Sequence, residues 1–416
     1  MNTFGMRVKA RCFIEYDSVA DLVDIEFEEL ARPVLHIGGG SNLLFTDDFK
    51  GTVLHSKIDF IEILDECHRD GVEKLNPSHS GEWAPPVHEA TGGHGFSNHS
   101  YGASSENDRV LVSVGAGVVF DDFCEWAANE DLWGVENLSY IPGEVGASAV
   151  QNIGAYGVEV KDVIHKVYCY DTVEEEFVHF DVEECGYGYR DSIFKKPEVK
   201  GRYIVTHVVF ALSRAPQPKL EYGHLKDAVA EVASSSSDPR LRKLRHPLAG
   251  GGTSLPSDAG PDTVADCHFE RSGSGDEKSL TPALIRKVII KIRKEKLPEP
   301  SVKGSAGSFF KNPVVPMEHF LKIEAAAKAE YGSDYKVPHY DLPDGMVKIP
   351  AAWMIEQCGW KGKRSGGAAV WDKQPLVIVN HTGEAYPEEI IGLEKRIIAS
   401  VRTRFGVELH PEVEHV

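Results

Sequence analysis

A serine in an apolar setting is the first group in this sequence that could do chemistry. Ser308 lies in the segment SAGSFFKNP, after a glycine and before two phenylalanines and a lysine. A hydroxyl in a dry pocket can donate a proton. A serine nucleophile would need a histidine base and an elbow such as GxSxG, and the sequence shows neither. It therefore favours a proton donor over a hydrolase, with a helix-capping serine as the structural alternative.

Two charged residues could act beside such a serine. Arg190, in the segment YRDSIFK, can clamp a carboxylate with two parallel hydrogen bonds. Taken alone, it is as well explained by a surface ion pair with Asp191 or another acid. Glu412, in the segment HPEV near the chain end, is on its own an ordinary solvated carboxylate. Both residues gain interest only if the fold brings them together.

Two glycine-rich segments are typical of a large anionic ligand. Residues 38–42 read GGGSN after an apolar stretch, and consecutive glycines let backbone N–H groups converge on a phosphate oxygen. Residues 141–157 read IPGEVGASAVQNIGAYG and contain no basic residue, so they can lie along a flat polar ring system. Each segment alone could be a structural turn or loop. Together they favour a dinucleotide, although neither is a GxGxxG or Walker motif.

Composition narrows the class of protein. The chain has 416 residues, a mass of 45.8 kDa and a net charge of −19, so no chain-wide basic footprint for nucleic acid exists. No run of ~18 apolar residues predicts a membrane span, and the N-terminus lacks a signal-peptide pattern. The seven cysteines form no CxxC pair, which disfavours zinc and a disulfide framework. We expect a cytoplasmic enzyme without a metal, and loop histidines His88, His94 and His99 that are solvated.

The elements that must position these groups alternate between helices and strands. An acidic amphipathic stretch predicts a helix over 19–30, capped by Ser18. One apolar face predicts a second helix through Phe120, Phe123, Cys124 and Ala127. Strands are predicted at 33–37, 52–54, 110–114, 163–170 and 203–212. This order indicates an α+β domain of mixed strands.

The C-terminal part predicts a separate α/β domain. Thr281 and Pro282 are a cap and a first-turn proline, and they start a helix with an apolar stripe from Leu284 to Ile292. Another helix starts at Tyr386-Pro387 and is expected to pack on strands at 368–370 and 376–379. Irregular stretches at about 65–108 and 234–280 are predicted to be surface insertions.

Taken together, these blocks closely resemble the UDP-N-acetylenolpyruvoylglucosamine reductases, flavoenzymes of peptidoglycan precursor synthesis. The resemblance covers most of the chain, and several blocks occur in the family's order. A tyrosine loop at Glu221-Tyr222-Gly223, with YRDS upstream, places the chain with the longer of the two family types. The matching blocks are NTFG (2–5), GGGSNLLF (38–45), residues 141–157, YRDSIFK (189–195), AGSFFKNP (306–313), AAWMIEQC (351–358), GGAAV (366–370) and PEV (411–413).

The resemblance implies a fold of the vanillyl-alcohol-oxidase type. Two α+β subdomains would hold FAD, at residues 1–60 and 61–215. Residues 216–280 would contain the tyrosine loop and an insertion. An α/β substrate-binding domain would span 281–405, and residues 406–416 would return to the active site.

The resemblance also implies a two-step reaction. NADPH gives a hydride to flavin N5, which passes it to C3 of the enolpyruvyl group of UDP-N-acetylglucosamine enolpyruvate. C2 is then protonated, giving UDP-N-acetylmuramate. Ser308 would donate this proton, while Arg190 and Glu412 would polarise the carboxylate and stabilise the enol.

Binding roles follow from the same matching. The substrate diphosphate and uridine would be held by Tyr222, Lys296 and Asn312, with Tyr189 and Gln357 as further contacts. Lys296 would also meet the NADPH phosphates. FAD would be held by two sets of residues, namely Gly38, Gly39, Gly40, Ser41 and Asn42, and Pro142, Gly143, Ser148, Gln151, Asn152, Gly154, Ala155, Tyr156 and Gly157.

Two departures and two alternatives stay open at this point. Glu414 stands where some relatives carry a basic residue, and the chain ends at Val416, so fraying there would misplace Glu412 unless its strand is paired. A flavin oxidase of the same fold is one alternative, with His36 as a flavin attachment point, although a core histidine explains His36 better. A catalytically inactive sugar-nucleotide-binding protein is the other. We expect a monomer.

Overall fold

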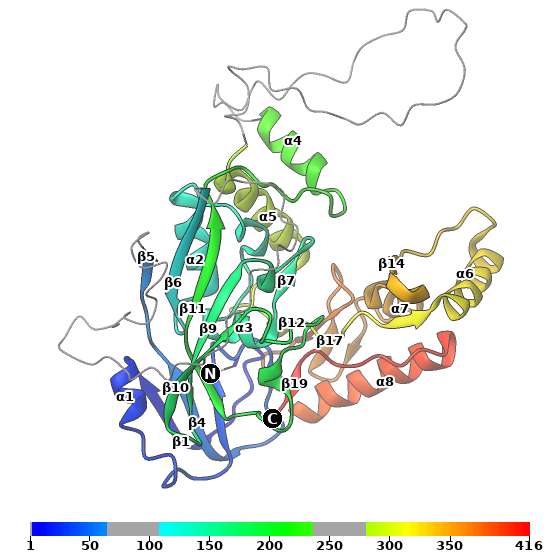
Figure 1. The fold of residues 1–416 in the computed structure, drawn as a ribbon. Helices are drawn as coiled ribbons and strands as arrows, with labels where there is room; N and C mark the ends of the chain where they lie inside the picture. Colours follow the sequence, from blue (N-terminus) through cyan, green and yellow to red (C-terminus); the bar gives the residue numbers. More distant parts are fainter. Residues whose placement is uncertain (1, 65–107, 236–279) are drawn as a thin grey trace, which may run out of the picture.

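The structure is a computed structural model that describes residues 2–64, 108–235 and 280–416. Apart from their end residues, the insertions expected at 65–108 and 234–280 lie outside the described residues. The same holds for His88, His94 and His99. Figure 1 shows a sheet-containing body formed by the N-terminal half, with the C-terminal half beside it and both termini near their junction.

A parallel three-stranded sheet forms the first layer, in the order β1-β4-β2. One face of this sheet buries Tyr16, Leu54 and Ile58 against Leu22 and Phe27. Strand β2 ends directly before residues 38–42, so the glycine loop follows the carboxyl end of this strand. The elements are β1 (Ala10–Tyr16), α1 (Val19–Val23), β2 (Val34–Ile37) and β4 (Phe49–Ser56).

The first helix is shorter than predicted, because α1 ends at Val23 instead of reaching residue 30. Leu22 and Phe27 both lie in the core under the sheet. At about 100° per residue they would point to different sides of one continuous helix. Ending the helix after its first turn lets both side chains reach the same core. Ser18 caps the helix as expected, and it forms a capping box with Asp21.

An antiparallel five-stranded sheet forms the second layer, in the order β10-β9-β11-β6-β5. Helix α2 packs on it through Phe123, whose ring centre lies 4.6 Å from that of Phe210, so the predicted apolar face is confirmed. The elements are β5 (Ile61–Leu64), β6 (Arg109–Gly115), α2 (Phe120–Asn129), α3 (Val145–Gln151), β9 (Ile164–Asp171), β10 (Glu176–Asp181) and β11 (Tyr203–Ser213), with the short η4 (Glu136–Leu138), β7 (Gly154–Ala155), β8 (Val158–Glu159), η5 (Val160–Asp162) and η6 (Ile193–Lys195).

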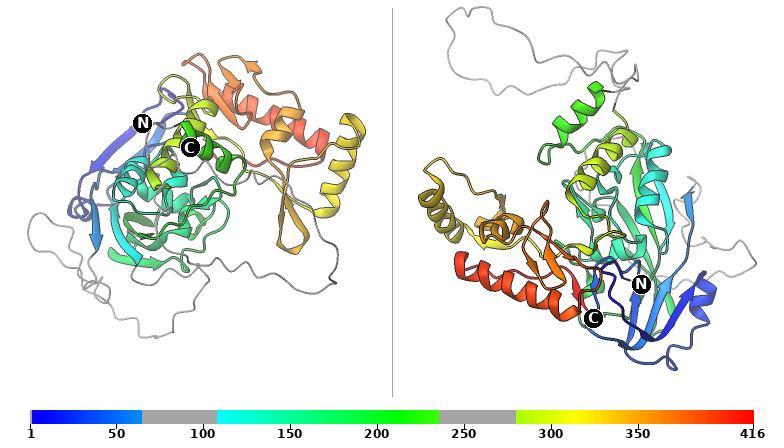
Figure 2. Two further views of the ribbon diagram at one scale, coloured as in Figure 1. Left: turned by 90° about the horizontal axis from the view of Figure 1, so that it is seen from above. Right: turned by 180° about the vertical axis from the view of Figure 1, so that it is seen from behind.

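The helix predicted at Thr281-Pro282 is α5 (Pro282–Lys296), and Thr281 caps it. Its stripe packs against Trp133 and against Leu225 and Val229 of α4 (Leu225–Ser235). Figures 1 and 2 show α5 lying along α2, on the side of the five-stranded sheet. The domain boundary expected at residue 281 stays a prediction, and this packing favours grouping α5 with the second sheet.

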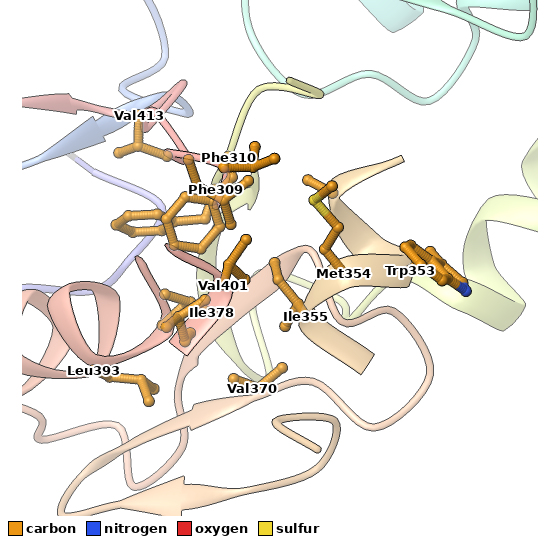
Figure 3. Packing of buried hydrophobic residues seen from close by; sticks show 14 of the residues in the cluster. Phe309, Phe310, Trp353, Met354, Ile355, Val370, Ile378, Leu393, Val401 and Val413 are labelled. Atoms are coloured by element: carbon orange, nitrogen blue, oxygen red, sulfur yellow. The ribbon is translucent and has the colours of Figure 1, made fainter. Parts of the chain in front are cut away.

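The C-terminal half surrounds a large apolar core, part of which appears in Figure 3, and a smaller cluster lies around Val377 and Val379. Helix α8 packs on β17 and β18 as predicted. Phe309, Phe310 and Val413 bring the segments around Ser308 and Glu412 into this core. The elements are β12 (Gly304–Ser308), β13 (Val314–Pro316), α6 (Met317–Tyr331), β14 (Tyr340–Leu342), η9 (Pro343–Gly345), β15 (Met346–Lys348), α7 (Ala351–Gln357), β16 (Arg364–Ser365), β17 (Ala368–Val370), β18 (Val377–Asn380) and α8 (Pro387–Phe405).

The chain end is tied to the segment that follows the glycine loop. Strand β19 (Glu414–His415) pairs in parallel with β3 (Leu43–Leu44), directly after the glycine loop. The Val416 carbonyl accepts from the backbone N–H of Thr46 at 2.7 Å. The strand is therefore paired, and Glu412 is not on a frayed end.

Candidate active site

Arg190 and Glu412, 222 residues apart in sequence, form an ion pair at the junction of the two halves. Arg190 Nε donates to Glu412 Oε1 at 2.7 Å, and the two side chains are 17% and 15% exposed. Asp191, the partner that the sequence alone suggested, pairs with Lys196 instead. The fold thus joins the two charged residues that the resemblance assigns to the substrate carboxylate.

Backbone carbonyls of the second glycine block fix the guanidinium of Arg190. Its Nη1 donates to the Asn152 carbonyl at 3.1 Å and its Nη2 to the Gly154 carbonyl at 2.7 Å. A Cβ on Gly154 would lie 3.0 Å from Nη1, so glycine leaves the room that this contact needs. Three of the five N–H groups of the arginine are used in this way, and two remain for a ligand.

Glu412 is held on both sides by backbone and side-chain contacts. Its N–H donates to the Phe309 carbonyl at 2.8 Å, next to an antiparallel bridge between Phe310 and Pro411. Its carbonyl accepts from Asn42 Nδ2 at 3.1 Å. The Asn42 carbonyl in turn accepts from the N–H of Glu414 at 3.0 Å. Asn42 of the glycine loop therefore grips the backbone that carries Glu412.

Ser308 is the last residue of β12, where it pairs with Val377. Its neighbour Phe309 is fully buried and accepts the backbone bond from Glu412, whereas Ser308 itself is exposed. Gly307 has φ +68, a left-handed conformation that glycine adopts without strain. The structure thus presents the serine hydroxyl one residue from the segment that positions Glu412.

A group of tyrosines lies beside this pair, and we call Tyr156, Tyr189, Tyr222 and Tyr340 the tyrosine cluster. The rings of Tyr222 and Tyr340 stack at 6.3 Å, and Tyr156 meets Tyr222 edge-on at 6.0 Å. Lys348 Nζ lies 4.9 Å from the ring centre of Tyr189 and 5.6 Å from that of Tyr340. Rings with a cation among them suit a sugar nucleotide, because they offer both stacking faces and a phosphate partner.

The remaining predicted substrate residues lie at different distances from this group. Asn312 Nδ2 is 3.5 Å from the Tyr189 hydroxyl, and its Oδ1 accepts from the N–H of Ala351. Lys296 ends α5 with an exposed side chain. For Gln357, the described residues show a contact only of its carbonyl, which accepts from Arg404 Nη1 at 2.6 Å. The structure therefore joins Asn312 to the tyrosine cluster, while Lys296 and Gln357 stay predictions.

The two glycine blocks contact each other, as a shared dinucleotide site requires. Ser41 Oγ donates to the Pro142 carbonyl at 3.0 Å, and a Cβ on Gly143 (φ +125) would lie 3.0 Å from the same oxygen. A Cβ on Gly38 would lie 3.0 Å from Cβ of Ala147. Side chains at Gly38 and Gly143 would crowd this contact, and two adjoining loops with few side chains suit a dinucleotide such as FAD.

Three polar residues that were predicted to bind the cofactor form hydrogen bonds with other parts of the protein. Ser148 Oγ donates to the Val145 carbonyl at 2.7 Å, and Gln151 Oε1 accepts from Lys195 Nζ at 2.8 Å. Asn152 Nδ2 donates to the Gly188 carbonyl at 2.7 Å. These side chains shape the loop, and their contact with FAD stays a prediction, as it does for Gly39, Gly40, Ala155, Tyr156 and Gly157.

His36 is a structural histidine, as expected. Its Nε2 lies 2.7 Å from the Tyr16 hydroxyl, and the two rings stack at 6.0 Å. Burial lowers the pKa of His36 to about 4. This bonding explains the histidine without a covalent flavin.

Sequence reasoning missed three side chains near the site, namely Tyr340, Lys348 and Lys195. Lys195 Nζ donates to the Arg190 carbonyl at 3.0 Å as well as to Gln151, and burial lowers the pKa of its ammonium group. Tyr340 and Lys348 lie opposite each other in the antiparallel pair of β14 and β15. A hairpin prediction through PDG at 343–345 would have placed them side by side.

Comparison with known proteins decides the family. The model described as UDP-N-acetylenolpyruvoylglucosamine reductase, C-terminal domain, matches residues 299–416, and an FAD binding domain model matches 97–180. A reductase of that name from Bacteroides fragilis strain YCH46 is 42% identical over 416 residues, covering 100% of this chain and 97% of the relative. The chain belongs to the UDP-N-acetylenolpyruvoylglucosamine reductase family.

Other members of the reductase family agree in extent and fold. The Porphyromonas gingivalis strain ATCC 33277 reductase is 37% identical over 420 residues, covering 100% of this chain and 96% of the relative. A crystal structure of the reductase from Thermus caldophilus aligns with a TM-score of 0.53 at 18% identity, over 100% of this chain and 95% of that one. The predicted α+β flavoprotein fold is confirmed. Among the helices that the structure describes, none is both long and apolar enough to cross a bilayer.

The contact between Asn42 and Glu412 gives a first prediction for this reductase family member. Asn42→Ala removes the amide that fixes the Glu412 carbonyl, so we expect kcat to fall about tenfold through misplacement of the carboxylate. Flavin content should stay that of the parent, because the loop at 38–42 would hold FAD through backbone N–H groups that the substitution leaves in place, whereas the Asn42 amide itself is bound to Glu412. Steady-state kinetics and the flavin-to-protein absorbance ratio measure both, and exposed Asn129→Ala of α2 is the control. Loss of flavin with a normal kcat per bound flavin would instead make Asn42 a cofactor ligand.

Proposed function

We propose that this chain reduces UDP-N-acetylglucosamine enolpyruvate to UDP-N-acetylmuramate with NADPH, in peptidoglycan precursor synthesis. The contact of Arg190 with Glu412, next to Ser308 and the tyrosine cluster, is the observation that carries the proposal. When bound, FAD takes a hydride from NADPH and supplies it to the enolpyruvyl carbon. The glycine loop at 38–42 and the block at 142–157 would hold the cofactor.

Arg190 is suited to the charge that develops when hydride reaches the carbon remote from the ether oxygen. Negative charge then spreads onto the substrate carboxylate, and the two free N–H groups of the arginine can donate to its oxygens. Carbonyls of the second glycine block hold the guanidinium before substrate arrives. A donor fixed in advance does not have to reorganise during the reaction.

Ser308 completes the reaction by giving a proton to the adjoining carbon. A serine hydroxyl is a weak acid, so it can act only on a strongly basic carbon in a site without bulk water. Ser308 is exposed in the protein alone, so bound cofactor and substrate would have to exclude water from its hydroxyl, while Phe309 and Phe310, which follow it in the chain, are buried. The proton completes the addition of two hydrogens across the double bond, and solvent restores it to the serine.

The tyrosine cluster, with Lys348 and Asn312, would bind the nucleotide part of the substrate. Tyr222 and Tyr340 are 45% and 42% exposed, so their ring faces are accessible. Lys348 supplies positive charge for a diphosphate in a chain whose net charge is −19. Tyr189 would link this region to Arg190, the next residue in sequence. Cζ of Arg190 lies 5.5 Å from the centre of the Tyr189 ring.

Removing the lysine charge tests this binding role. We expect Lys348→Met to raise the KM for the UDP-linked substrate by about tenfold, with kcat changed less, because an ammonium that contacts a diphosphate strengthens binding throughout the reaction. The KM for NADPH should not change. Lys322→Met on the exposed face of α6 is the matched control. A fall in kcat at constant KM would remove Lys348 from the binding surface.

The proposed reaction is tested by its stoichiometry. Purified holoenzyme should oxidise one NADPH for each UDP-N-acetylmuramate formed, measured by NADPH absorbance and by mass spectrometry of the product. NADPH oxidation that needs oxygen and yields no such product would favour the flavin oxidase alternative. Binding of the UDP-sugar without any NADPH oxidation would favour the inactive binding protein.

We also propose that the enzyme acts as a monomer in the cytoplasm. Its nucleotide substrates suit that compartment, and so do the cysteines of the described residues, which form no disulfide with one another. Light scattering on the eluting protein should give a mass near 45.8 kDa. A mass twice as large would contradict the monomer.

A further inference from the structure

We infer that the carboxylate of Glu144 is a binding group for a sugar hydroxyl of the dinucleotide cofactor, beside the glycine loop at 38–42. The inference rests on the proposed FAD site and adds Glu144, which lies inside the second glycine block but received no binding role from the sequence. It commits to one chemistry, an alcohol O–H donating to a carboxylate oxygen.

Glu144 lies in the second glycine block and is 9% exposed. It precedes α3, but its side chain does not cap that helix. Its Oε1 lies instead 3.0 Å from Nε2 of His55, in the middle of the parallel sheet. The opposite nitrogen of this imidazole lies 2.9 Å from Glu15 Oε1, and the histidine side chain is 1% exposed. Two carboxylates therefore fix one buried imidazole.

The second oxygen of Glu144 has no donor among the described residues, although it is buried. It points to the start of the glycine loop, because a Cβ on Gly38 would lie 3.2 Å from it. Buried carboxylate oxygens in folded proteins almost always accept hydrogen bonds. An acceptor of this kind, facing a loop that must stay free of side chains, indicates a donor on a ligand.

Charge decides which kind of donor this is. A carboxylate beside the glycine loop would repel a diphosphate oxygen, so its partner is a neutral O–H next to the phosphates. The hydrogen bond to Glu144 raises the pKa of the His55 imidazole. In FAD the hydroxyls nearest the diphosphate are on the adenosine ribose and on the ribityl chain. Both offer the same chemistry, and the experiment separates them.

The test measures cofactor affinity alone. Full-length enzyme freed of flavin is titrated with FAD and followed by flavin fluorescence, with neither NADPH nor substrate present. We expect E144A to weaken FAD binding by roughly 10- to 100-fold, the range for a hydrogen bond to a charged group. E15A is the matched control, because Glu15 holds the other nitrogen of His55 and is 46% exposed. It should stay within about threefold of the parent.

FAD analogues lacking single hydroxyls identify the partner and keep the test decisive if E144A does not fold. In the parent, one deoxy analogue of the ribose or of the ribityl chain should bind roughly 10- to 100-fold more weakly than FAD. In E144A that analogue and FAD should bind alike. Equal affinity of the parent for FAD and all analogues would overturn the inference, as would an E144A protein that keeps the parent's preference. A parent protein that binds no FAD would contradict the proposed function instead.

Discussion

Ser308→Ala should leave the reduction of bound flavin by NADPH almost unchanged and slow its reoxidation by the UDP-linked substrate by about 10²- to 10⁴-fold, the usual range for loss of a general acid. The variant removes only the hydroxyl oxygen at the end of β12. Because the Ser308 side chain is exposed and is not part of the core, the variant should keep the fold. The proton is needed only after hydride has reached the substrate, so only the second half-reaction should suffer.

Anaerobic stopped-flow spectroscopy separates the two half-reactions through the flavin absorbance. Ser301→Ala, an exposed serine in the turn before β12, is the matched control and should behave as the parent. An equal loss in both half-reactions would show that Ser308 supports the cofactor site rather than donating the proton. Product analysis in deuterated solvent adds a second readout, because the parent should place one solvent-derived deuterium on the carbon that carries the ether oxygen.

Arg190→Met has the second large expected effect. The substitution keeps a long side chain but removes the donors that meet the developing charge on the substrate carboxylate. Loss of such electrostatic stabilisation costs about 10²- to 10³-fold in the rate of reoxidation. Bound FAD should be retained, because the glycine blocks would hold it through their backbones. Lys196→Met, which breaks the neighbouring exposed pair with Asp191, is the control.

The ion pair itself predicts how Arg190 and Glu412 combine. If the carboxylate acts by orienting the guanidinium, Glu412→Gln should slow reoxidation less than Arg190→Met, and the double variant should be no slower than Arg190→Met alone. Additive losses would give the two side chains independent roles. Loss of FAD from Arg190→Met would make this arginine a structural link between the glycine block and the chain end, and would remove it from the chemistry.

Local patterns predicted much of the fold. Helices α2, α5 and α8 and the strands between them could be predicted, because their apolar spacing depends only on residues close in sequence. The glycine blocks could be recognised because segments whose backbones approach closely must be rich in glycine. The predicted end of α1 was wrong, because the packing of Phe27 in the core overrode the amphipathic pattern. The packing of helix α5 against Trp133 could not be predicted, because the two segments are far apart in sequence.

The candidate site was only partly predictable, for the same reason. The resemblance supplied Arg190 and Glu412, but the bond between them spans 222 residues and depends on β19 pairing beside the glycine loop. The His55–Glu144 contact joins residues 89 apart, and each looks ordinary in its own segment. Lys348 gains its position from the rings of Tyr189 and Tyr340, which belong to opposite halves of the chain.

The most direct test of the whole account is the visible absorption spectrum of the purified protein, followed anaerobically through two additions. Oxidised flavin bands should bleach when NADPH is added and return when UDP-N-acetylglucosamine enolpyruvate follows. That sequence would establish the cofactor, the hydride source and the acceptor in one cuvette. A colourless protein that FAD cannot reconstitute, or flavin bands that NADPH bleaches and this substrate fails to restore, would contradict the account.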